Sequence, residues 1–455
     1  MMFPIFQVPY LGNGMTIALD AVLHVVISHG LAIGAVTMVV VSEYLGQRRA
    51  SLDWEGFARD FLRVIVLLTT SVGAITGVGI WLITSALAPR GIGSLLRVFF
   101  WPWFMEWGVF TAEVVIVLIY YYTWQRWTGE RKKHHLRLGL GYIAAALCSA
   151  VLITGILGFM LTPDGWPWDK SLWSAFFNPS YLPQLALRLG IAYSLGTIFS
   201  VAYLVFTKRE QNFRQEALAF FAKIAFFSLT VTLLSAVWYF KVVPSTFKTH
   251  SIYAVMTSRF SQQPDLFWKF NLGGAIFLLL FWLVALCRSV IFVRLLVVPA
   301  IMVAILFVAQ FERVREFIRG PYLMPGYMYA NQVLLEETPL FAKKGMLPNS
   351  SWYNATAKPE DSTSQGAYLF AQNCSACHTI GGINNIVDRV QGRTADGLYV
   401  IIGHIQEMVP FMPPFSGTDQ ERRAMADFLF RLGDGSIKPG APSRFTPLNG
   451  GSGHE

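Results

Sequence analysis

Long apolar runs separated by short polar segments fill the first 311 residues of the chain. A helix that crosses a bilayer needs about 20 mainly apolar residues, because it must satisfy its own backbone hydrogen bonds across the hydrocarbon layer. Runs of this length predict membrane-spanning helices at about 16–42, 60–87, 99–123, 138–161, 182–206, 217–243, 267–287 and 290–311. The pattern therefore predicts an all-α fold, with a polytopic membrane helix bundle of about eight transmembrane helices.

The pattern changes near residue 320, where the long apolar runs end. Residues 320–362 are rich in Pro, Gly, Asn, Ser and Tyr, which is typical of a surface linker. Residues 363–435 show helical periodicity at both ends and predict a small all-α domain. The polar residues 436–455 predict a flexible tail. We therefore expect a bundle over 1–319 followed by a linker, a small domain and a tail.

Composition agrees with a membrane protein, since hydrophobic residues make up 54% of the chain and charged residues only 14%. Soluble domains carry about 25% charged residues. These values exclude a disordered or collagen-like chain and argue against a nucleic-acid partner. The N-terminus has no basic segment followed by a small-residue cleavage site, so we expect no cleaved signal peptide.

The basic residues behind the net charge of +9 are distributed unevenly between the loops. The connections after the first, third, fifth and seventh predicted helices hold twelve of them, and the opposite side holds six. The positive-inside rule therefore predicts that the N-terminus lies outside. After eight crossings the C-terminal domain is expected outside as well.

Cys374-Ser375-Ala376-Cys377-His378 is a C-x-x-C-H sequence, the attachment signature of c-type haem. Two thiols at this spacing reach the haem vinyl groups from one turn of chain, and the adjacent imidazole reaches the iron from the same side. A zinc or redox C-x-x-C site is the alternative. A helical pattern before the motif and a capped helix starting near Thr418 favour haem c.

Met412-Pro413-Pro414-Phe415 stands between the motif and that last helix. Together these elements resemble a class I cytochrome c over about 75 residues. The resemblance implies that His378 and Met412 are the axial iron ligands, with Met408 and His404 as competitors for the second position. A Met/His pair raises the haem potential and suits electron transfer. Haem c is attached on the outer face of bacterial membranes, in agreement with the charge count.

Several ionisable residues fall within the predicted spanning helices, where charge is costly and points to function. Asp20 and His24 are four residues apart, so the carboxylate could orient the imidazole. Glu106 and Glu113, seven apart, also share a helix face. On the inferred topology His24, Glu106 and Glu316 lie in the outer half of the membrane, which suggests one site near the haem c domain. The alternative is that each is a satisfied buried polar residue.

Four segments of the bundle resemble subunit I of the cytochrome bd-type quinol oxidases. Ala18-Leu19-Asp20-Ala21-Val22-Leu23-His24, with Glu43 near the far end of the same helix, is similar to that family's first helix. Gly73-Ala74-Ile75-Thr76-Gly77 and the paired glutamates match the next two helices. Glu316-Phe317-Ile318-Arg319-Gly320-Pro321-Tyr322 is similar to the family's E-x-G-R-Q-P-W segment. The likeness covers about residues 15–322.

This resemblance implies two non-covalent haems of b or d type in addition to the one covalent haem c. His24 would be an axial ligand at the oxygen-reactive haem, with Glu106 at or near its distal side. Glu316 would ligate a high-spin haem b, and Arg319 matches the arginine of the same motif. Glu113 would lie between the haems and handle protons. The two glutamates are one residue closer together than in the family.

Two further departures from the family concern the route by which quinol delivers electrons. The family's low-spin haem b needs a His and a Met, and Leu187 and Gly273 occupy those positions here. The quinol loop is shortened to about 244–266. The resemblance thus implies that this haem is absent and that haem c takes over electron input.

We therefore expect a membrane cytochrome of the bacterial inner membrane that passes electrons between a periplasmic donor or acceptor protein, haem c and membrane haems, and reduces oxygen. A second bd-like membrane subunit is the expected partner. One alternative is an electron-transfer subunit without oxygen reduction, and another is a membrane anchor without membrane haem. His134, His135 and His250 are expected to be solvated surface residues.

Overall fold

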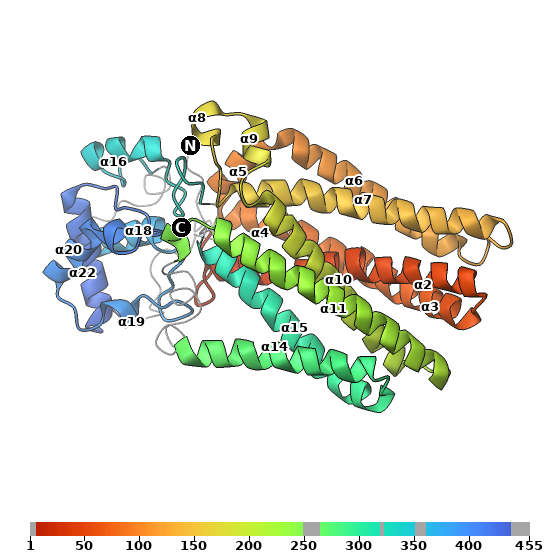
Figure 1. Ribbon diagram of the computed structural model, residues 1–455. Helices are drawn as coiled ribbons and strands as arrows, with labels where there is room; N and C mark the ends of the chain where they lie inside the picture. Colours follow the sequence, from red (N-terminus) through yellow and green to blue (C-terminus); the bar gives the residue numbers. More distant parts are fainter. Residues whose placement is uncertain (1–5, 249–263, 319–322, 351–360, 438–455) are drawn as a thin grey trace, which may run out of the picture.

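The computed structural model is a bundle of long helices that carries a small helical domain at one end (Figure 1). It describes residues 6–248, 264–318, 323–350 and 361–437, and the side chains of 264 and 316–318 lie outside that description. Within these residues the named elements are all helices, and extended pairing is limited to isolated bridges. The predicted all-α class is confirmed.

Among the described residues, eight helices are long and apolar enough to cross a membrane, which confirms the predicted number. They span Asn13–Arg49, Leu52–Leu87, Phe100–Thr123, Arg131–Phe159, Leu172–Phe206, Gln211–Val242, Asp265–Leu286 and Val290–Arg315. Large apolar side chains such as Phe104, Trp107 and Leu283 are exposed on the bundle, as expected for a surface against lipid tails.

The first two spans each contain a stretch of π-helix. The first consists of α1 (Asn13–Val25), the π-helix η1 (Val26–Ala35) and α2 (Val36–Arg49). The second consists of α3 (Leu52–Leu68), η2 (Thr69–Gly73) and α4 (Ala74–Leu87). The two π-helical stretches pack against each other. Such wide turns recur at functional sites in helical proteins.

The other spans are single helices, apart from a short helix at the start of the fifth. They are α6 (Phe100–Thr123), α7 (Arg131–Phe159), α10 (Tyr181–Phe206), α11 (Gln211–Val242), α14 (Pro264–Leu286) and α15 (Val290–Ile318). We call the end of the bundle that carries the small domain the near end, and the opposite end, where α2 meets α3 and α6 meets α7, the far end (Figure 1).

Short helices cover the near end and build the small domain. Those at the near end are α5 (Pro89–Val98), α8 (Trp166–Asp169) and α9 (Leu172–Phe176). Those that follow the bundle are the 3₁₀ turn η3 (Leu335–Glu337), α16 (Thr338–Lys344), α18 (Ser362–Asn373), α19 (Val387–Val390), α20 (Ala395–Gly403), α21 (Ile405–Met408) and α22 (Asp419–Gly433). The core of the small domain forms where α18 packs on α22.

Glycine allows the first span to approach α10 closely. A Cβ atom on Gly196 would lie 2.2 Å from the carbonyl carbon of Gly34, and one on Gly34 would lie 2.0 Å from the carbonyl oxygen of Ala192. The two backbones are therefore in direct contact, as small residues permit in membrane helices. This crossing brings the polar side chains of η1 next to those of α10.

Residues 323–350, from the segment predicted as a linker, are well packed. Met324 and Met328 are buried in a near-end cluster with Phe159 and Trp166. Val333, Phe341, Met346 and Leu347 are buried in the core of the small domain. The segment therefore joins the cores of bundle and domain, and the exact domain boundaries stay a prediction.

Candidate functional site

The C-x-x-C-H motif forms a single turn directly after α18. The His378 amide donates to the Cys374 carbonyl at 2.8 Å, and the Cys377 amide donates to the same oxygen at 3.1 Å. The Cys374 amide in turn donates to the Phe370 carbonyl at 2.8 Å, which continues the helix into the motif. Both thiols and the imidazole are thus held within one turn, which fits covalent attachment of a haem.

The backbone fixes the orientation of the His378 ring. Its Nδ1 lies 3.2 Å from the carbonyl oxygen of Asn384, so Nε2 is the nitrogen left to bind iron. Asn384 adopts a positive φ of 53° and donates from Nδ2 to the Cys377 carbonyl at 2.7 Å. Burial lowers the pKa of His378 to about 4, so its ring is neutral near pH 7. Burial also raises the pKa of the Cys374 thiol to about 12.

The three candidates for the second iron ligand differ in exposure. Met412 is half-buried in the loop before α22, and its amide donates to the Val409 carbonyl at 2.9 Å. Met408 is 55% exposed. His404 is also exposed, and its Nδ1 lies 3.1 Å from a Glu407 carboxylate oxygen. Exposure and hydrogen bonding therefore favour Met412 over its two competitors.

The N-terminal segment before α1 contacts the haem c motif directly. Gln7 donates from Nε2 to the hydroxyl of Ser375 at 2.7 Å. The Ile383 amide donates to the Tyr10 carbonyl at 2.7 Å, and a Cβ atom on Gly382 would lie 2.0 Å from that same oxygen. A Cβ atom on Gly14, in α1, would lie 3.3 Å from the Ala376 carbonyl. The motif therefore sits against the start of the first spanning helix.

The loop on the Met412 side also contacts the bundle. Phe411 packs on a near-end cluster that includes Val243 and Leu323. A separate ion pair joins the bundle to the segment after it: Arg90 of α5 donates from Nη1 and Nη2 to the two carboxylate oxygens of Glu337, at 2.9 and 2.8 Å. The small domain is thus held to the near end through both loops expected to flank its haem.

His24 occupies a half-buried position near the π-helical stretches. Its Nδ1 lies 3.2 Å from the hydroxyl of Thr76 in α4, and its ring also forms a hydrogen bond with the backbone of Gly73. A Cβ atom on Gly77 would lie 3.2 Å from His24 Cε1, so glycine makes room for the ring. Asp20 makes no described hydrogen bond to His24, so Thr76 takes the orienting role that the sequence suggested for Asp20.

A buried ion cluster, defined as His29, Arg188, Glu312 and Arg315, lies where η1, α10 and α15 meet. His29 Nε2 lies 3.2 Å from Arg188 Nη1, and Arg188 Nη2 lies 3.3 Å from Glu312 Oε1. Arg315 donates from Nε to Glu312 Oε2 at 2.9 Å. All four side chains are buried. Sequence reasoning missed this cluster, because its members come from three distant helices.

The two predicted glutamates of α6 face α7. The Ser149 hydroxyl donates to Glu106 at 3.2 Å. Glu113 is 8% exposed, and its Oε1 has no hydrogen-bond partner among the described residues. The helix of His24 packs on α4 and α15, whereas α6 packs on α7. Because α4 also touches α6, where the ring centroids of Trp81 and Trp103 are 4.6 Å apart, a shared site for His24 and the glutamates stays a prediction.

Comparison with protein families decides what this bundle is. Residues 14–266, more than half of the chain, match the family model described as cytochrome bd terminal oxidase subunit I. The chain belongs to this bd oxidase family. Residues 361–429 match the model described as cytochrome C oxidase, cbb3-type, subunit III. This bd-family chain is thus a multi-pass membrane cytochrome of respiratory electron transfer, with a cytochrome c domain that implies covalent haem c.

The fold of this bd-family chain is also found in a solved structure, the bd oxidase from Geobacillus thermodenitrificans. The two chains share 19% sequence identity with a TM-score of 0.58, over 68% of this chain and 87% of that chain. A comparison with curated proteins gave no match. The structural likeness supports the helical fold inferred from the sequence.

Some residues that the sequence singled out in the bundle lie wholly or partly outside the described residues. Glu316 lies in α15, one residue after Arg315, and its side chain lies outside the described residues, as does all of Arg319. Their roles stay predictions. His250 is likewise outside the described residues, and His134 is exposed as expected.

The interpretation of His135 as a surface residue is wrong. Its side chain is buried at the far end, with Nδ1 2.7 Å from Glu43 Oε1 and Nε2 2.9 Å from the Tyr120 carbonyl oxygen. Its position next to a run of basic residues suggested solvent. The ring instead stacks on Tyr120 at a centroid distance of 4.5 Å.

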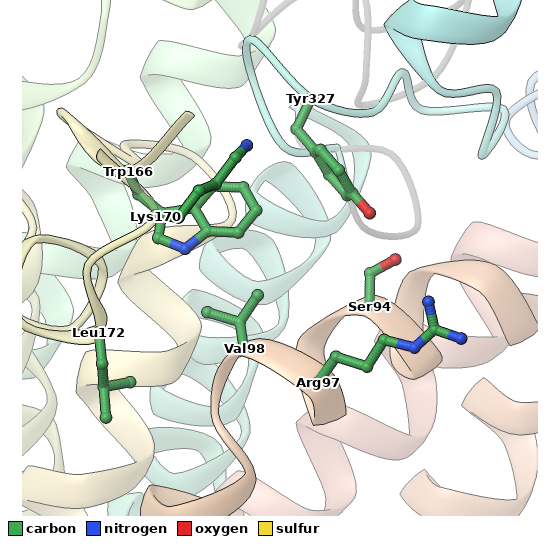
Figure 2. A pocket seen from close by; sticks show the side chains of 7 residues that line it. All are labelled: Ser94, Arg97, Val98, Trp166, Lys170, Leu172 and Tyr327. Atoms are coloured by element: carbon green, nitrogen blue, oxygen red, sulfur yellow. The ribbon is translucent and has the colours of Figure 1, made fainter. Parts of the chain in front are cut away.

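A separate cavity of about 360 Å³ lies at the near end (Figure 2). Its lining residues are Ser94, Arg97, Val98, Trp166, Lys170, Leu172 and Tyr327. The Lys170 ammonium lies 4.3 Å from the ring centroid of Trp166 and 5.4 Å from that of Tyr327. None of the predicted haem ligands lines this cavity, so it is distinct from the candidate haem sites.

Proposed function

We propose that this chain takes electrons from a periplasmic donor protein through haem c, passes them to haems of b or d type in the bundle, and reduces oxygen there. The observation that carries the proposal is the contact of the haem c motif with the start of α1. Along that helix, His24 is ten residues beyond Gly14, about 15 Å at the usual helical rise. Haem c and His24 are thereby linked through one rigid helix.

The residues of the small domain fit haem c. Cys374 and Cys377 would form the two thioethers, and His378 and Met412 would ligate the iron. Haem c supplies one-electron transfer when bound. The chain's own contribution is to hold the His378 ring through Asn384 and to press both flanking loops against the bundle.

In the bundle, His24 would ligate the oxygen-reactive haem, and the Thr76 hydroxyl beside Nδ1 would help to orient its ring. Glu316 would ligate the second haem, with Arg319 nearby in sequence. The buried ion cluster contains two arginines and one glutamate, so it can pair with a haem propionate. Glu106 and Glu113 would handle protons, since a buried carboxylate can hold a proton at neutral pH.

The identities of Leu187 and Gly273 support the absence of the low-spin haem b, because neither residue has a side chain that can ligate iron. Leu187 is buried in α10, whereas a Cβ atom built on Gly273 in α14 has no atom of the described residues within 4 Å. A haem held between these positions would need two ligands that this chain does not provide. Electron input through haem c is consistent with that loss.

Topology and partners belong to the same proposal. The loop charges favour a bacterial inner membrane protein with its N-terminus and cytochrome c domain on the periplasmic side. A second bd-like membrane subunit would cover part of the exposed apolar surface of the bundle. Purification from native membranes with subunit identification tests the partner directly.

Carbon monoxide binding tests oxygen chemistry. The purified holoprotein is reduced and exposed to carbon monoxide, and a shifted membrane-haem spectrum is expected because oxygen reduction needs an open iron site. An unchanged spectrum would rule out oxygen reduction and leave electron transfer alone. Pyridine haemochrome analysis of the same sample is expected to give b- or d-type haem besides haem c. If haem c is the only haem found, the bundle holds no membrane haem and acts only as a membrane anchor.

A further inference from the structure

The near-end cavity shown in Figure 2 has positive charge and no acidic side chain among its lining residues. Arg97 and Lys170 supply the charge, and neither forms an ion pair with a carboxylate of the described residues. Both residues are exposed, so the cavity is open to the surroundings of the protein. Its volume of about 360 Å³ lies in the usual range for small-molecule sites, about 300–1,000 Å³. The cavity therefore suits an anionic group.

The backbone and two aromatic rings hold Lys170 on one wall of this cavity. Its amide donates to the Trp166 carbonyl at 2.9 Å, and its φ of 51° ends α8 at this residue. Its ammonium lies 4.3 Å from the ring centroid of Trp166 and 5.4 Å from that of Tyr327. The neighbouring Asp169 carboxylate accepts a hydrogen bond from the Ser174 hydroxyl at 2.9 Å, so it is engaged with α9. The positive charge of Lys170 thus stays available to a ligand.

The other polar groups of the cavity are hydrogen-bond donors. Ser94 and Tyr327 line it, and Figure 2 shows their hydroxyl groups on the same side as the Arg97 guanidinium. Arginine, lysine and hydroxyl groups together are typical partners of phosphate oxygens. Because Lys170 already lies against the two aromatic rings, the cavity offers no free aromatic cage to the ammonium group of a zwitterionic ligand.

The cavity lies at the level where two membrane spans begin. Leu172, which lines it, is the first residue of the fifth span, and Val98 precedes the third span, Phe100–Thr123, by two residues. Next to these positions Trp101 and Trp173 are exposed. Exposed tryptophan at the ends of spanning helices is typical of the membrane interface, where lipid headgroups lie.

Helix α5 supports the same placement. It buries Ile92 and Leu95 and exposes Arg97 on its other face. A helix with one apolar and one basic face fits the interfacial plane of a membrane. A ligand of the cavity is therefore drawn from the headgroup layer.

We propose that this cavity binds the phosphate of an anionic phospholipid. Arg97 and Lys170 pair with the phosphate oxygens, and the hydroxyl groups of Ser94 and Tyr327 donate to them. The acyl chains lie along the exposed apolar surface at the start of α6. Because Tyr327 belongs to residues 323–350, the bound lipid ties that segment to α5. The inference goes beyond the proposed function and uses no haem, so either can fail without the other.

Lipid binding is measured by native mass spectrometry of the delipidated holoprotein in detergent. Dioleoyl phosphatidylglycerol and dioleoyl phosphatidylethanolamine are titrated separately. Phosphatidylglycerol should bind more tightly, because it is anionic and has no ammonium group for the two cations to repel. Arg97→Gln and Lys170→Gln should each weaken its binding about fivefold, and the double variant about 25-fold, in line with the usual contribution of a basic residue toward anionic lipid.

Lys241→Gln is the matched control. Lys241 is exposed in the last turn of α11, at the same end of the bundle but outside the cavity lining. Its substitution should leave phosphatidylglycerol binding unchanged. Haem spectra and thermal unfolding verify that each variant is folded. If the double variant is unstable, Arg97→Gln alone decides the test, because its side chain is exposed.

Inorganic phosphate distinguishes a free anion from a lipid headgroup. It should displace phosphatidylglycerol poorly, because it has no acyl chains to lie against the bundle. Displacement at concentrations equal to those of the lipid would make free phosphate the ligand and overturn the proposal. Equal binding of the two lipids, or wild-type binding in the cavity variants, would overturn it as well.

Discussion

Two histidines in this chain have a hydrogen-bonding oxygen next to ring nitrogen Nδ1. In His378 a backbone carbonyl engages Nδ1, and in His24 the Thr76 hydroxyl does so. A hydrogen bond at Nδ1 sets the tautomer and ring orientation before a metal arrives. Both residues therefore have the arrangement expected of an iron ligand, although one lies in a loop and the other in a spanning helix.

Replacing His24 tests the membrane site. His24→Ala should remove one membrane haem from the spectrum and leave haem c intact, because the two sites share no side chain. Optical spectra and pyridine haemochromes of the purified variant measure this. Thr76→Val should keep the haem with an altered spectrum. Retention of every haem in His24→Ala would show that His24 is no ligand.

Replacing Met412 tests the haem c ligand. Met412→Ala should lower the haem c midpoint potential by an amount on the order of 100 mV, since axial ligands set haem potentials over about 0.8 V. Covalent attachment should persist, because the thioethers use Cys374 and Cys377. Redox titration gives the potential. Met408→Ala, at an exposed position, should leave it unchanged, and the opposite pattern would make Met408 the ligand.

Sequence motifs identify the residues of a site well when those residues are close together in the sequence. They identify them poorly when the residues come from distant helices. Cys374, Cys377 and His378 of the haem c motif lie within five positions of one another, so their spacing alone predicts one turn. Arg188 and Glu312 are 124 residues apart and meet only because η1, α10 and α15 converge. His135 was misread because the burial of its ring depends on Glu43, which lies on another helix.

At the scale of elements, the eight spans were predictable because a bilayer allows only helices with internally satisfied backbones. The π-helical stretches were not, since they depend on how η1 packs against η2 and α10. The decisive contact is the crossing of Gly34 and Gly196, where the backbones touch. This crossing fixes how far His29 lies from Arg188.

Adding one methyl group at that crossing should therefore lower the free energy of unfolding. Gly196→Ala would place a Cβ atom 2.2 Å from the Gly34 carbonyl carbon, and overpacking of this kind typically costs about 1–3 kcal/mol. Thermal unfolding in detergent measures the loss. Gly273→Ala is the matched control, since nothing lies within 4 Å of its new methyl group. Equal stability of both variants would contradict the tight crossing.

At the scale of the whole molecule, contacts among the described residues hold the cytochrome c domain and its connecting segment to the bundle. They include the N-terminal segment on the haem c motif, Phe411 on the near-end cluster, and the Arg90–Glu337 pair. Residues 323–350 connect the two cores. The sequence suggested a surface linker there, because its Pro and Gly content resembles that of free loops.

Removing the ion pair should loosen this attachment. Glu337→Gln breaks a two-point, partly buried contact and should lower the stability of the domain on the bundle by about 1–2 kcal/mol. It should also slow transfer from haem c to the membrane haems in stopped-flow measurements. Glu336→Gln, at an exposed neighbouring position, is the control. Identical kinetics in all three proteins would show that the pair does not support docking.

The packed connection of residues 323–350 has a kinetic consequence. A carrier that diffuses to its oxidase delivers electrons in a second-order step, whose rate depends on protein concentration and ionic strength. Here the carrier domain and the bundle belong to one chain, and residues 323–350 join their cores. Electron transfer from haem c to the bundle therefore becomes a first-order step at a fixed effective concentration. Salt and dilution should then affect only the arrival of electrons at haem c, and not their onward passage.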